Sequence, residues 1–465
     1  MIEEKDLFKP EEKRYRILMA SDFFYPNVGG VENHIFQLSQ CLIKRGHKVV
    51  VCTHQYKKRK GIRYMTNGLK VYYIPKQPTF RQTTLPTLLN SLPMFRNIMI
   101  RERIDIVHGH QATSCICHET ITCAREMGIK TVFTDHSLFS FNEIGSFNLH
   151  KVSNYSLAEI NHVICVSHTG KENTSLRAKI HPIKVSVIPN AIDASQFTPD
   201  PSKKTPGEIT IVVMSRHTYR KGVDLLIQLI PIVCKKVPNA KFVIGGDGPN
   251  RVNIEEMREK YNLHDRIEML GFVPHELVRN VLTRGDIFLN TSLTEAFCIA
   301  IVEAASCGLF VVSTAVGGVP EVLPSHMIKF AKPDAEQLAQ AVIDSIGPSQ
   351  EVDPWLFHSQ VKNMYNWDDV AERTEAVYDK IQFDVQQPLV NRIHRYFNCG
   401  TWASKAFCFA LALQFLFMLI LEWLMPANEV DIAPDFPLKQ FLKNKDKLNQ
   451  SWTKSYKVIE RANEK

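Results

Sequence analysis

Short apolar runs alternate with segments of helical periodicity along most of the chain. The runs are rich in Val and Ile, and such continuous runs are typical of parallel strands that are covered on both faces. In the first half they lie at residues 16–21, 48–52, 104–108, 131–134 and 162–166. Between the first two runs, Ile35, Leu38 and Leu42 follow helical spacing, and Gly46 is a typical helix-ending residue. The pattern predicts a βαβ unit at the start of the chain.

A Pro-rich stretch at residues 199–207 interrupts this alternation. A second series of apolar runs then follows at 209–214, 241–244, 267–270, 286–289 and 309–313. Two such series predict an α/β protein with two doubly wound, Rossmann-like domains that face a cleft, at residues 1–200 and 207–383. Ligands of such sheets bind beyond the carboxyl ends of the strands, so the loops after the runs are where we expect chemistry.

One segment near the C-terminus, residues 406–425, is apolar except for Gln414 and Glu422. About 20 helical residues rise roughly 30 Å, the thickness of a bilayer core. The alternatives are a buried helix of a soluble domain and an in-plane amphipathic helix, but the segment has no polar face. We therefore expect a transmembrane helix between a juxtamembrane segment, 384–405, and a tail, 426–465.

The flanks of this segment predict its orientation. The N-terminus has no secretory signal peptide, and basic residues precede the apolar segment whereas acidic residues follow it. We expect a single-pass protein with cytosolic catalytic domains and a luminal tail. The sequon at Asn449 can be glycosylated only if the tail is luminal.

Composition adds few constraints. The 465 residues are 45% apolar and 22% charged, which is ordinary for a folded protein. The net charge of +8 is spread along the chain without a dense basic block, so we expect no nucleic acid partner. The eleven cysteines include no Cys-x-x-Cys pair, which fits a reducing compartment.

Two cations follow the first strand of the second predicted domain. Arg216 and Lys221 lie in the loop at 215–222, where a guanidinium and an ammonium group can bind a diphosphate and offset the charge of a leaving phosphate. The alternative is a solvated loop. Its place at the carboxyl end of a strand favours a functional role.

Two glutamates, Glu295 and Glu303, follow a later strand of the same domain. We expect the segment after Glu295 to be helical, with the two side chains about 80° apart and about 12 Å along the axis. They could hold opposite ends of a polyhydroxyl ligand, since a carboxylate can accept hydrogen bonds from two neighbouring hydroxyl groups. The alternative is that the negative charge of Glu295 only stabilises the start of the helix through its dipole, and that Glu303 is an exposed acid. Glu303 lies among apolar residues, so it needs a ligand or an internal partner.

Gly29 and Gly30 follow the first strand of the chain, where backbone N–H groups can approach a phosphate or a sugar. The alternative is a simple tight turn, and the pair taken alone favours that alternative. His108, His110 and His136 lie at the ends of further strands, but their spacing matches no common metal site. With no Asp-x-Asp pair to hold a divalent ion, we expect metal-independent chemistry without a cofactor. The motifs of serine hydrolases and P-loop nucleotidases are also missing.

These residues carry a family resemblance. The Glu-x7-Glu pair, the Arg-x4-Lys pair and the early Gly-Gly are similar to those of retaining GT-B glycosyltransferases. Longer strings, at 21–26, 29–32, 134–139, 188–191 and 290–298, resemble the catalytic subunits of phosphatidylinositol N-acetylglucosaminyltransferases. That family also has one membrane span near the C-terminus.

The resemblance implies transfer of N-acetylglucosamine from UDP-GlcNAc to phosphatidylinositol with retention of configuration. This is the first step of GPI anchor biosynthesis, at the endoplasmic reticulum membrane, within a complex of several membrane subunits. It also implies residue roles: Glu303 for the ribose, Glu295 for the transferred sugar, and Arg216 with Lys221 for the diphosphate. The backbone of Phe297 would contact phosphate or sugar, and Gly30 and His136 would complete the cleft.

Two other functions remain open at this point. One is an enzyme of the same fold that acts on a soluble glycan. The other is a donor-binding scaffold that leaves catalysis to a partner, although Lys221 and Glu295 count against it.

Overall fold

The computed structural model describes residues 14–80, 82–139, 144–397, 399–400 and 402–437. Contacts within the chain group it into two compact units. The first unit comprises residues 1–132 with 385–465, and the second comprises residues 133–384. The predicted domain limits of 200 and 207 stay a prediction.

An eight-stranded sheet contains the early apolar runs, and its strand β8 belongs to both units. The strand order is β10-β9-β8-β7-β1-β2-β4-β3, and β3 is antiparallel to β4. The strands are β1 Arg16–Ala20, β2 Lys48–His54, β3 Gly61–Tyr64, β4 Lys70–Ile74, β7 Ile106–His110, β8 Lys130–Asp135, β9 His162–Cys165 and β10 Val185–Val187. A separate two-stranded sheet pairs β5 Pro78–Phe80 with β6 Thr83–Thr84.

A six-stranded parallel sheet lies entirely in the second unit, in the order β13-β12-β11-β14-β15-β16. Its strands are β11 Ile209–Met214, β12 Ala240–Gly245, β13 Ile267–Gly271, β14 Ile287–Asn290, β15 Phe310–Thr314 and β16 Ile328–Ala331. The centre of the sheet is fully apolar: Ile211, Val212 and Ile287 have no measurable exposure. Such burial on both faces is the favoured state for parallel strands covered by helices.

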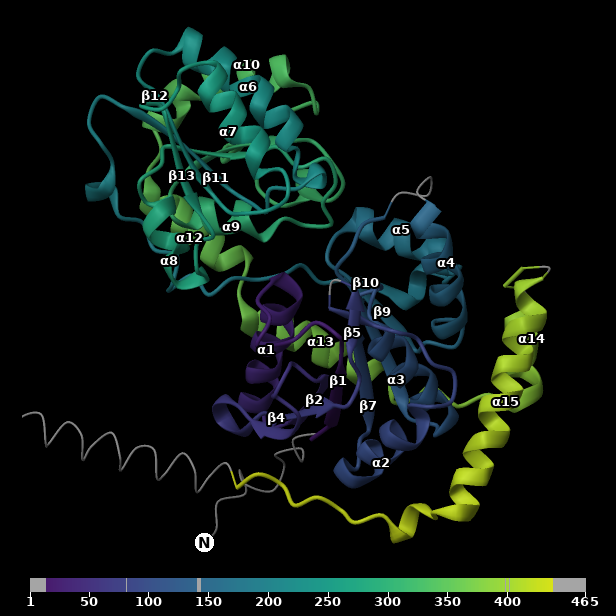
Figure 1. The fold of residues 1–465 in the computed structure, drawn as a ribbon. Coiled ribbons are helices and arrows are strands. Elements are labelled where there is room, and N and C mark those ends of the chain that lie inside the picture. Colours follow the sequence, from purple (N-terminus) through teal and green to yellow (C-terminus); the bar gives the residue numbers. More distant parts are fainter. Residues whose placement is uncertain (1–13, 81, 140–143, 398, 401, 438–465) are drawn as a thin grey trace, which may run out of the picture. The chain divides into compact units, whose positions relative to one another are not determined.

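Helices follow the strands in alternation (Figure 1). They are α1 Gly30–Lys44, α2 Leu92–Glu102, α3 Cys115–Glu126, α4 Ile144–Ser156, α5 His168–Ala178, α6 Val223–Lys236, α7 Arg251–Lys260, α8 His275–Leu282, α9 Ile299–Ser306, α10 Ala335–Asp344, α11 Ile346–Gln350, α12 Pro354–Met364, α13 Trp367–Ile381, α14 Leu389–Phe397 and α15 Ala403–Leu424. Short 3-10 turns are η2 Thr66–Gly68, η3 Pro182–Lys184, η4 Pro201–Lys203, η5 Tyr219–Lys221, η6 Val319–Glu321 and η7 Ala427–Glu429.

The first helix forms as its apolar spacing predicts. Ile35, Leu38 and Leu42 of α1 are buried, and Gly46 after its end has φ of +94° and donates to the carbonyl of Ile43. This left-handed residue ends the helix where the sequence places the stop. All the apolar runs predicted as strands in both halves of the chain are confirmed, with ends that differ by a few residues. The strands β3, β4, β5, β6, β10 and β16 were not predicted.

The predicted apolar segment forms the helix α15, which starts slightly earlier than expected. An 18-residue window of this helix has a mean hydropathy of 2.1, and the helix length of 22 residues suffices to cross a bilayer. Within the first unit one of its faces is covered, at Ser404, Leu411, Gln414 and Leu421. Large apolar side chains such as Trp402, Phe409 and Trp423 are exposed on the other side.

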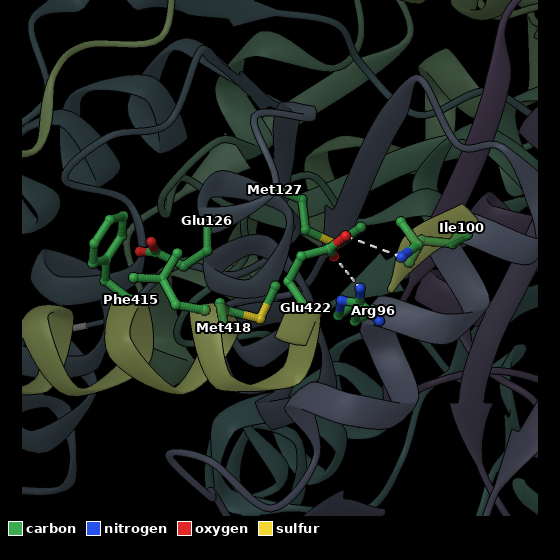
Figure 2. Close-up of a pocket in the computed structure, with 9 residues that line it drawn as sticks. Arg96, Ile100, Glu126, Met127, Phe415, Met418 and Glu422 are labelled. Carbon is green, nitrogen blue, oxygen red and sulfur yellow. Dashed lines mark hydrogen bonds and ion pairs between the residues drawn. The ribbon is translucent and has the colours of Figure 1, made fainter. Parts of the chain in front are cut away.

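Helix α15 contacts α3, and α14 lies beside it (Figure 1). Its residue Glu422 also contacts α2. Arg392 of α14 forms a bidentate ion pair with Glu126 of α3, at 2.6 and 3.1 Å, and both side chains are almost fully buried. Figure 2 shows Glu422 of α15 in contact with Arg96 of α2. A cavity of about 300 Å³ lies beside this contact, lined also by Phe415 and Met418. It contains none of the predicted site residues.

The segment after α15 returns to the same unit. The backbone N–H of Ala433 donates to the carbonyl of Arg101 at 2.9 Å, and Asp435 pairs with Lys48 at 2.8 Å. Lys48 also pairs with the buried Glu102. Both flanks of α15 are therefore bound to the first unit. A bilayer core is about 30 Å thick, so these contacts and a luminal tail exclude each other. Asn449 lies outside the described residues.

Candidate active site

The strand order of the six-stranded sheet places two loops side by side. Chain order reverses between β11 and β14, which are hydrogen-bonded neighbours. At such a switch point the following loops diverge and leave a crevice at the carboxyl ends of the strands. The loop after β11 carries Arg216 and Lys221, and the loop after β14 carries Glu295. The fold thus brings together residues that are far apart in the sequence.

Close backbone packing joins the two loops. Gly222 has φ of +69°, and a Cβ at this position would lie 1.8 Å from the carbonyl oxygen of Thr291. The hydroxyl of Thr291 donates to the carbonyl of Lys221 at 2.8 Å, and the N–H of Leu293 donates to the carbonyl of Arg220 at 2.9 Å. Only glycine suits this position, because it combines a positive φ with space for no side chain. These contacts fix Lys221 relative to the second loop.

The ammonium group of Lys221 donates a hydrogen bond to the Glu295 carboxylate. The hydroxyl of Ser292 donates to the same carboxylate oxygen at 2.8 Å and is itself bound to Asn290. Burial works to lower the pKa of Lys221, but the charge and the hydrogen bond of Glu295, together with the nearby Cys298, outweigh it and raise the pKa above its usual value. Lys221 is therefore a fixed cation at neutral pH.

The expected helical position of Glu295 is wrong. Helix α9 begins only at Ile299, and Cys298 before it has a left-handed backbone with φ of +73°. Glu295 lies in the loop, so the angle and rise expected from one continuous helix do not apply. Phe297 is buried and packs edge-on against Tyr365, with ring centroids 5.5 Å apart. Only the backbone of Phe297 can serve a ligand in this arrangement.

Glu303 lies inside α9 and is 7% exposed. The imidazole Nε2 of His275, the first residue of α8, lies 3.3 Å from its carboxylate. The requirement for a ligand or an internal partner at Glu303 is thus met by a histidine. No sequence pattern pointed to His275, because an isolated histidine at a helix start has no distinctive spacing.

A second Gly-Gly pair, Gly317-Gly318, also shapes the Glu295 loop. The N–H of Gly318 donates to the carbonyl of Glu295 at 3.0 Å. Added Cβ atoms would lie 2.1 Å from the carbonyl oxygen of Glu295 at Gly317 and from that of Ala296 at Gly318. The signal that could have found this pair is its position in the loop that follows a buried strand, as for Gly29-Gly30. Because Gly317 and Gly318 have no side chains, the turn that they form can pack closely against the loop of Glu295.

Two further predicted residues belong to the second unit. Arg216 is exposed and follows β11 directly, where its guanidinium is accessible to an anion. His136 is half-buried and follows β8. Its neighbour Asp135 is buried and accepts hydrogen bonds from Ser137 and Thr174, while burial raises the pKa of Asp135. Asp135 thus orders the start of the loop that carries His136.

The glycines of the first unit lie at a helix start. Gly29 is extended and precedes α1, and Gly30 is its first residue with no neighbouring atom within 4 Å of an added Cβ. Both are exposed, so the backbone there is open to a ligand. The buried Asp22 orders the loop before them, since its carboxylate binds the Ser114 hydroxyl at 2.7 Å and backbone N–H groups.

The early histidines gather at the end of β7 in the first unit. The rings of His108 and His110 stack at 4.2 Å, and His34 of α1 lies 5.7 Å from His110. Burial lowers the pKa of His108 to about 3, so it is neutral. The absence of a resident metal stays a prediction.

The charged side chains of the second unit can bind two kinds of ligand group. Lys221 and Arg216 offer positive charge at the switch point, which suits a diphosphate. Glu295 and Glu303 offer carboxylate oxygens, which suit hydroxyl groups.

Sequence families match this chain in two regions. The PIGA (GPI anchor biosynthesis) family matches residues 54–143, and the glycosyl transferases group 1 family matches residues 195–347. A phosphatidylinositol N-acetylglucosaminyltransferase subunit from Arabidopsis thaliana is 54% identical, over 92% of this chain and 96% of its own length. The subunit of the same enzyme from Homo sapiens is 51% identical, over 92% of this chain and 89% of its own length.

Solved structures agree on the fold. Sucrose-phosphate synthase from Thermosynechococcus elongatus superimposes with a TM-score of 0.64 at 19% identity, over 79% of this chain and 99% of that structure. Anabaena HepE in complex with UDP gives 0.63 at 15% identity, over 79% of this chain and 100% of that structure. With the group 1 match, these similarities establish the GT-B fold expected from the sequence.

Proposed function

The chain belongs to the PIGA family of phosphatidylinositol N-acetylglucosaminyltransferase subunits, and on this premise we propose the reaction that it catalyses. It transfers N-acetylglucosamine from UDP-GlcNAc to phosphatidylinositol and retains the configuration of the sugar. This is the first step of GPI anchor biosynthesis. The observation that carries the proposal is the contact between Lys221 and Glu295 beside the helix of Glu303.

The proposed roles follow from the charges of these side chains. Lys221 and Arg216 bind the diphosphate and stabilise the negative charge that grows on it as the glycosidic bond breaks. Glu295 binds the hydroxyl groups of the transferred sugar, and Glu303 binds the ribose. Within the second unit, His136 and the backbone of Phe297 also serve the donor, and for the first unit we propose the backbone at Gly29 and Gly30 as a ligand contact of its own. We place the incoming hydroxyl on the same face as the leaving phosphate, so positioning and charge stabilisation provide most of the catalysis.

We propose that the reaction needs no metal. A divalent cation can offset the charge of a diphosphate, and here two cationic side chains, Arg216 and Lys221, can take that role. A transfer rate that is unchanged by EDTA supports this, and a rate restored only by added divalent ions contradicts it.

We also propose association with the endoplasmic reticulum membrane through α15, with both units on the cytosolic face. The relatives are named as subunits, which supports assembly with further membrane subunits. The exposed apolar face of α15 supports contact with lipid or with another membrane helix.

The position of the tail has a direct test. If Asn449 carries a glycan in microsomes, the tail is luminal. The ion pair between Asp435 and Lys48 is then broken when the protein is in the membrane. The docked arrangement instead predicts no glycan at Asn449, because Asp435 stays paired with Lys48 of the first unit.

Transfer itself is tested with microsomes, labelled UDP-GlcNAc and phosphatidylinositol. Label in a lipid extract that depends on this chain supports the proposal. Label that stays in the aqueous phase favours a soluble glycan as acceptor. A chain that binds UDP but never transfers sugar, even within its complex, is a scaffold.

A further inference from the structure

The partner of Glu303 lies outside the loops that hold the other site residues. Glu303 is almost fully buried in α9, where an unpaired carboxylate would be costly to desolvate. His275, at the start of α8, places Nε2 3.3 Å from Oε1 of this carboxylate. The two helices are separated by strand β14 and its following loop in the sequence. The contact is therefore a product of the fold and not of local chain geometry.

The ring of His275 is held from a second side. Phe197 packs edge-on against it, with ring centroids 5.7 Å apart. The side chain is 40% exposed. The imidazole thus packs against Phe197 and contacts Glu303, and part of it stays accessible to solvent. A side chain held in this way fixes the direction of the carboxylate that it contacts.

We propose that His275 is a positioning residue, which holds the Glu303 carboxylate in the orientation that receives the hydroxyl groups of the donor ribose. This inference rests on the proposed function, in which Glu303 binds the ribose. A carboxylate held by one oxygen keeps the other oxygen available to a ligand. His275 thereby determines how well the site distinguishes ribose from a sugar that lacks a hydroxyl group.

The charges around His275 favour its protonated form. The hydrogen bond to Glu303 raises the pKa of His275 above its ordinary value, and burial only partly opposes this. Glu276, its neighbour in α8, acts in the same direction. Arg279, one turn further along α8, is directed to the carbonyl of Thr198 at 2.8 Å. On α12, His358 faces the carbonyl groups of Ser306 and Phe197.

The test compares the affinities of UDP and 2′-deoxy-UDP for the full-length chain in detergent. Both nucleotides carry the same diphosphate, so the ratio of their dissociation constants reports only the missing hydroxyl group. For the wild-type chain we expect a preference for UDP of roughly tenfold or more, the scale of a hydrogen bond to a charged group. In His275→Ala we expect the preference to fall to about two- or threefold, because Glu303 loses its fixed orientation.

Two further variants separate positioning from a general loss of structure. His275→Gln keeps an N–H donor that does not titrate. This variant should restore the preference for UDP over 2′-deoxy-UDP, and the ratio of the two dissociation constants should be the same at about pH 5.5 and about pH 8.5. His264→Ala is the matched control, since His264 forms a surface pair with Glu259 at 3.2 Å in the same unit. It should keep the wild-type ratio.

Separate outcomes contradict the inference and the proposed function. If His275→Ala keeps the full wild-type ratio at both pH values, or if the wild-type chain binds both nucleotides equally, His275 does not position Glu303 for ribose. If the wild-type chain binds neither nucleotide, the proposed donor itself is wrong.

Discussion

Lys221 and Glu295 are 74 residues apart and form a direct ion pair, with the ammonium group donating to the carboxylate. The pair joins the loop after β11 to the loop after β14, across the switch point of the sheet. Each side chain restrains the other, so the cation that we propose for the diphosphate and the anion that we propose for the sugar are held in defined positions.

Removal of this cation should abolish most of the transfer. In Lys221→Met we expect the rate to fall by about 10²–10³, because the charge that grows on the leaving diphosphate loses a fixed donor. The measurement is initial-rate transfer with saturating donor. Lys241→Met is the matched control, since Lys241 forms an exposed pair with Glu208 at 2.6 Å. A rate equal to that of the control would remove Lys221 from the site.

Loss of the second glutamate should mainly weaken donor binding. In Glu303→Ala we expect a loss of roughly 2 kcal/mol or more in transition-state stabilisation, the scale of charged hydrogen bonds. Kinetics at several UDP-GlcNAc concentrations check this through kcat/KM. Glu259→Ala tests the same substitution at the surface pair with His264. Undiminished transfer by Glu303→Ala would show that its carboxylate does not contact the donor.

The close approach at Gly222 predicts a large effect of a single methyl group. In Gly222→Ala the new Cβ would overlap the carbonyl oxygen of Thr291, so the Lys221 loop must shift. We expect a loss of roughly 1–3 kcal/mol in stability and a fall in transfer. Gly207→Ala separates the two causes, because Gly207 has a similar φ of +80° but open space around it. Thermal unfolding that is equal for both variants would contradict the steric argument.

The ion pair between α14 and α3 should stabilise the first unit. Glu126→Ala leaves the buried Arg392 guanidinium without its partner, at a cost of roughly 3–5 kcal/mol. A lowered unfolding temperature of the full chain in detergent checks this. The double variant Glu126→Ala, Arg392→Leu should recover part of the loss, since it removes the unpaired charge. No recovery would mean that packing, and not charge, sets the effect.

The raised pKa of His275 gives a pH dependence with a definite sign. A raised pKa in the folded state contributes stability that is complete below the unfolded value of about 6.5 and is lost as the pH rises through the folded value. We expect His275→Gln to lower the unfolding temperature more at about pH 5.5 than at about pH 8.5. An equal difference at both pH values would contradict this.

The two sheets were predictable because their central strands are continuous apolar runs. The edge strand β3 has only exposed residues, so no pattern of burial marks it, and it exists through its pairing with β4. Strand β10 is only three residues long. Such short edge strands depend on neighbours that are distant in the sequence.

The site was predictable at the level of its residues but not of their contacts. The strand-end positions of Lys221 and Glu295 indicated one ligand site, whereas their ion pair depends on the order of β11 and β14 in the sheet. The start of α9 was mispredicted because Cys298 adopts a left-handed backbone that its residue type does not favour. His275 became part of the site only through the packing of α8 against α9.

One measurement tests most directly whether this chain transfers N-acetylglucosamine to a lipid. Microsomes that contain the wild-type chain or its Lys221→Met variant are incubated with labelled UDP-GlcNAc and phosphatidylinositol, and the lipids are extracted. We predict a labelled glycolipid with the wild-type chain and almost none with the variant. Equal lipid label with both chains, or label only in the aqueous phase, would contradict the account.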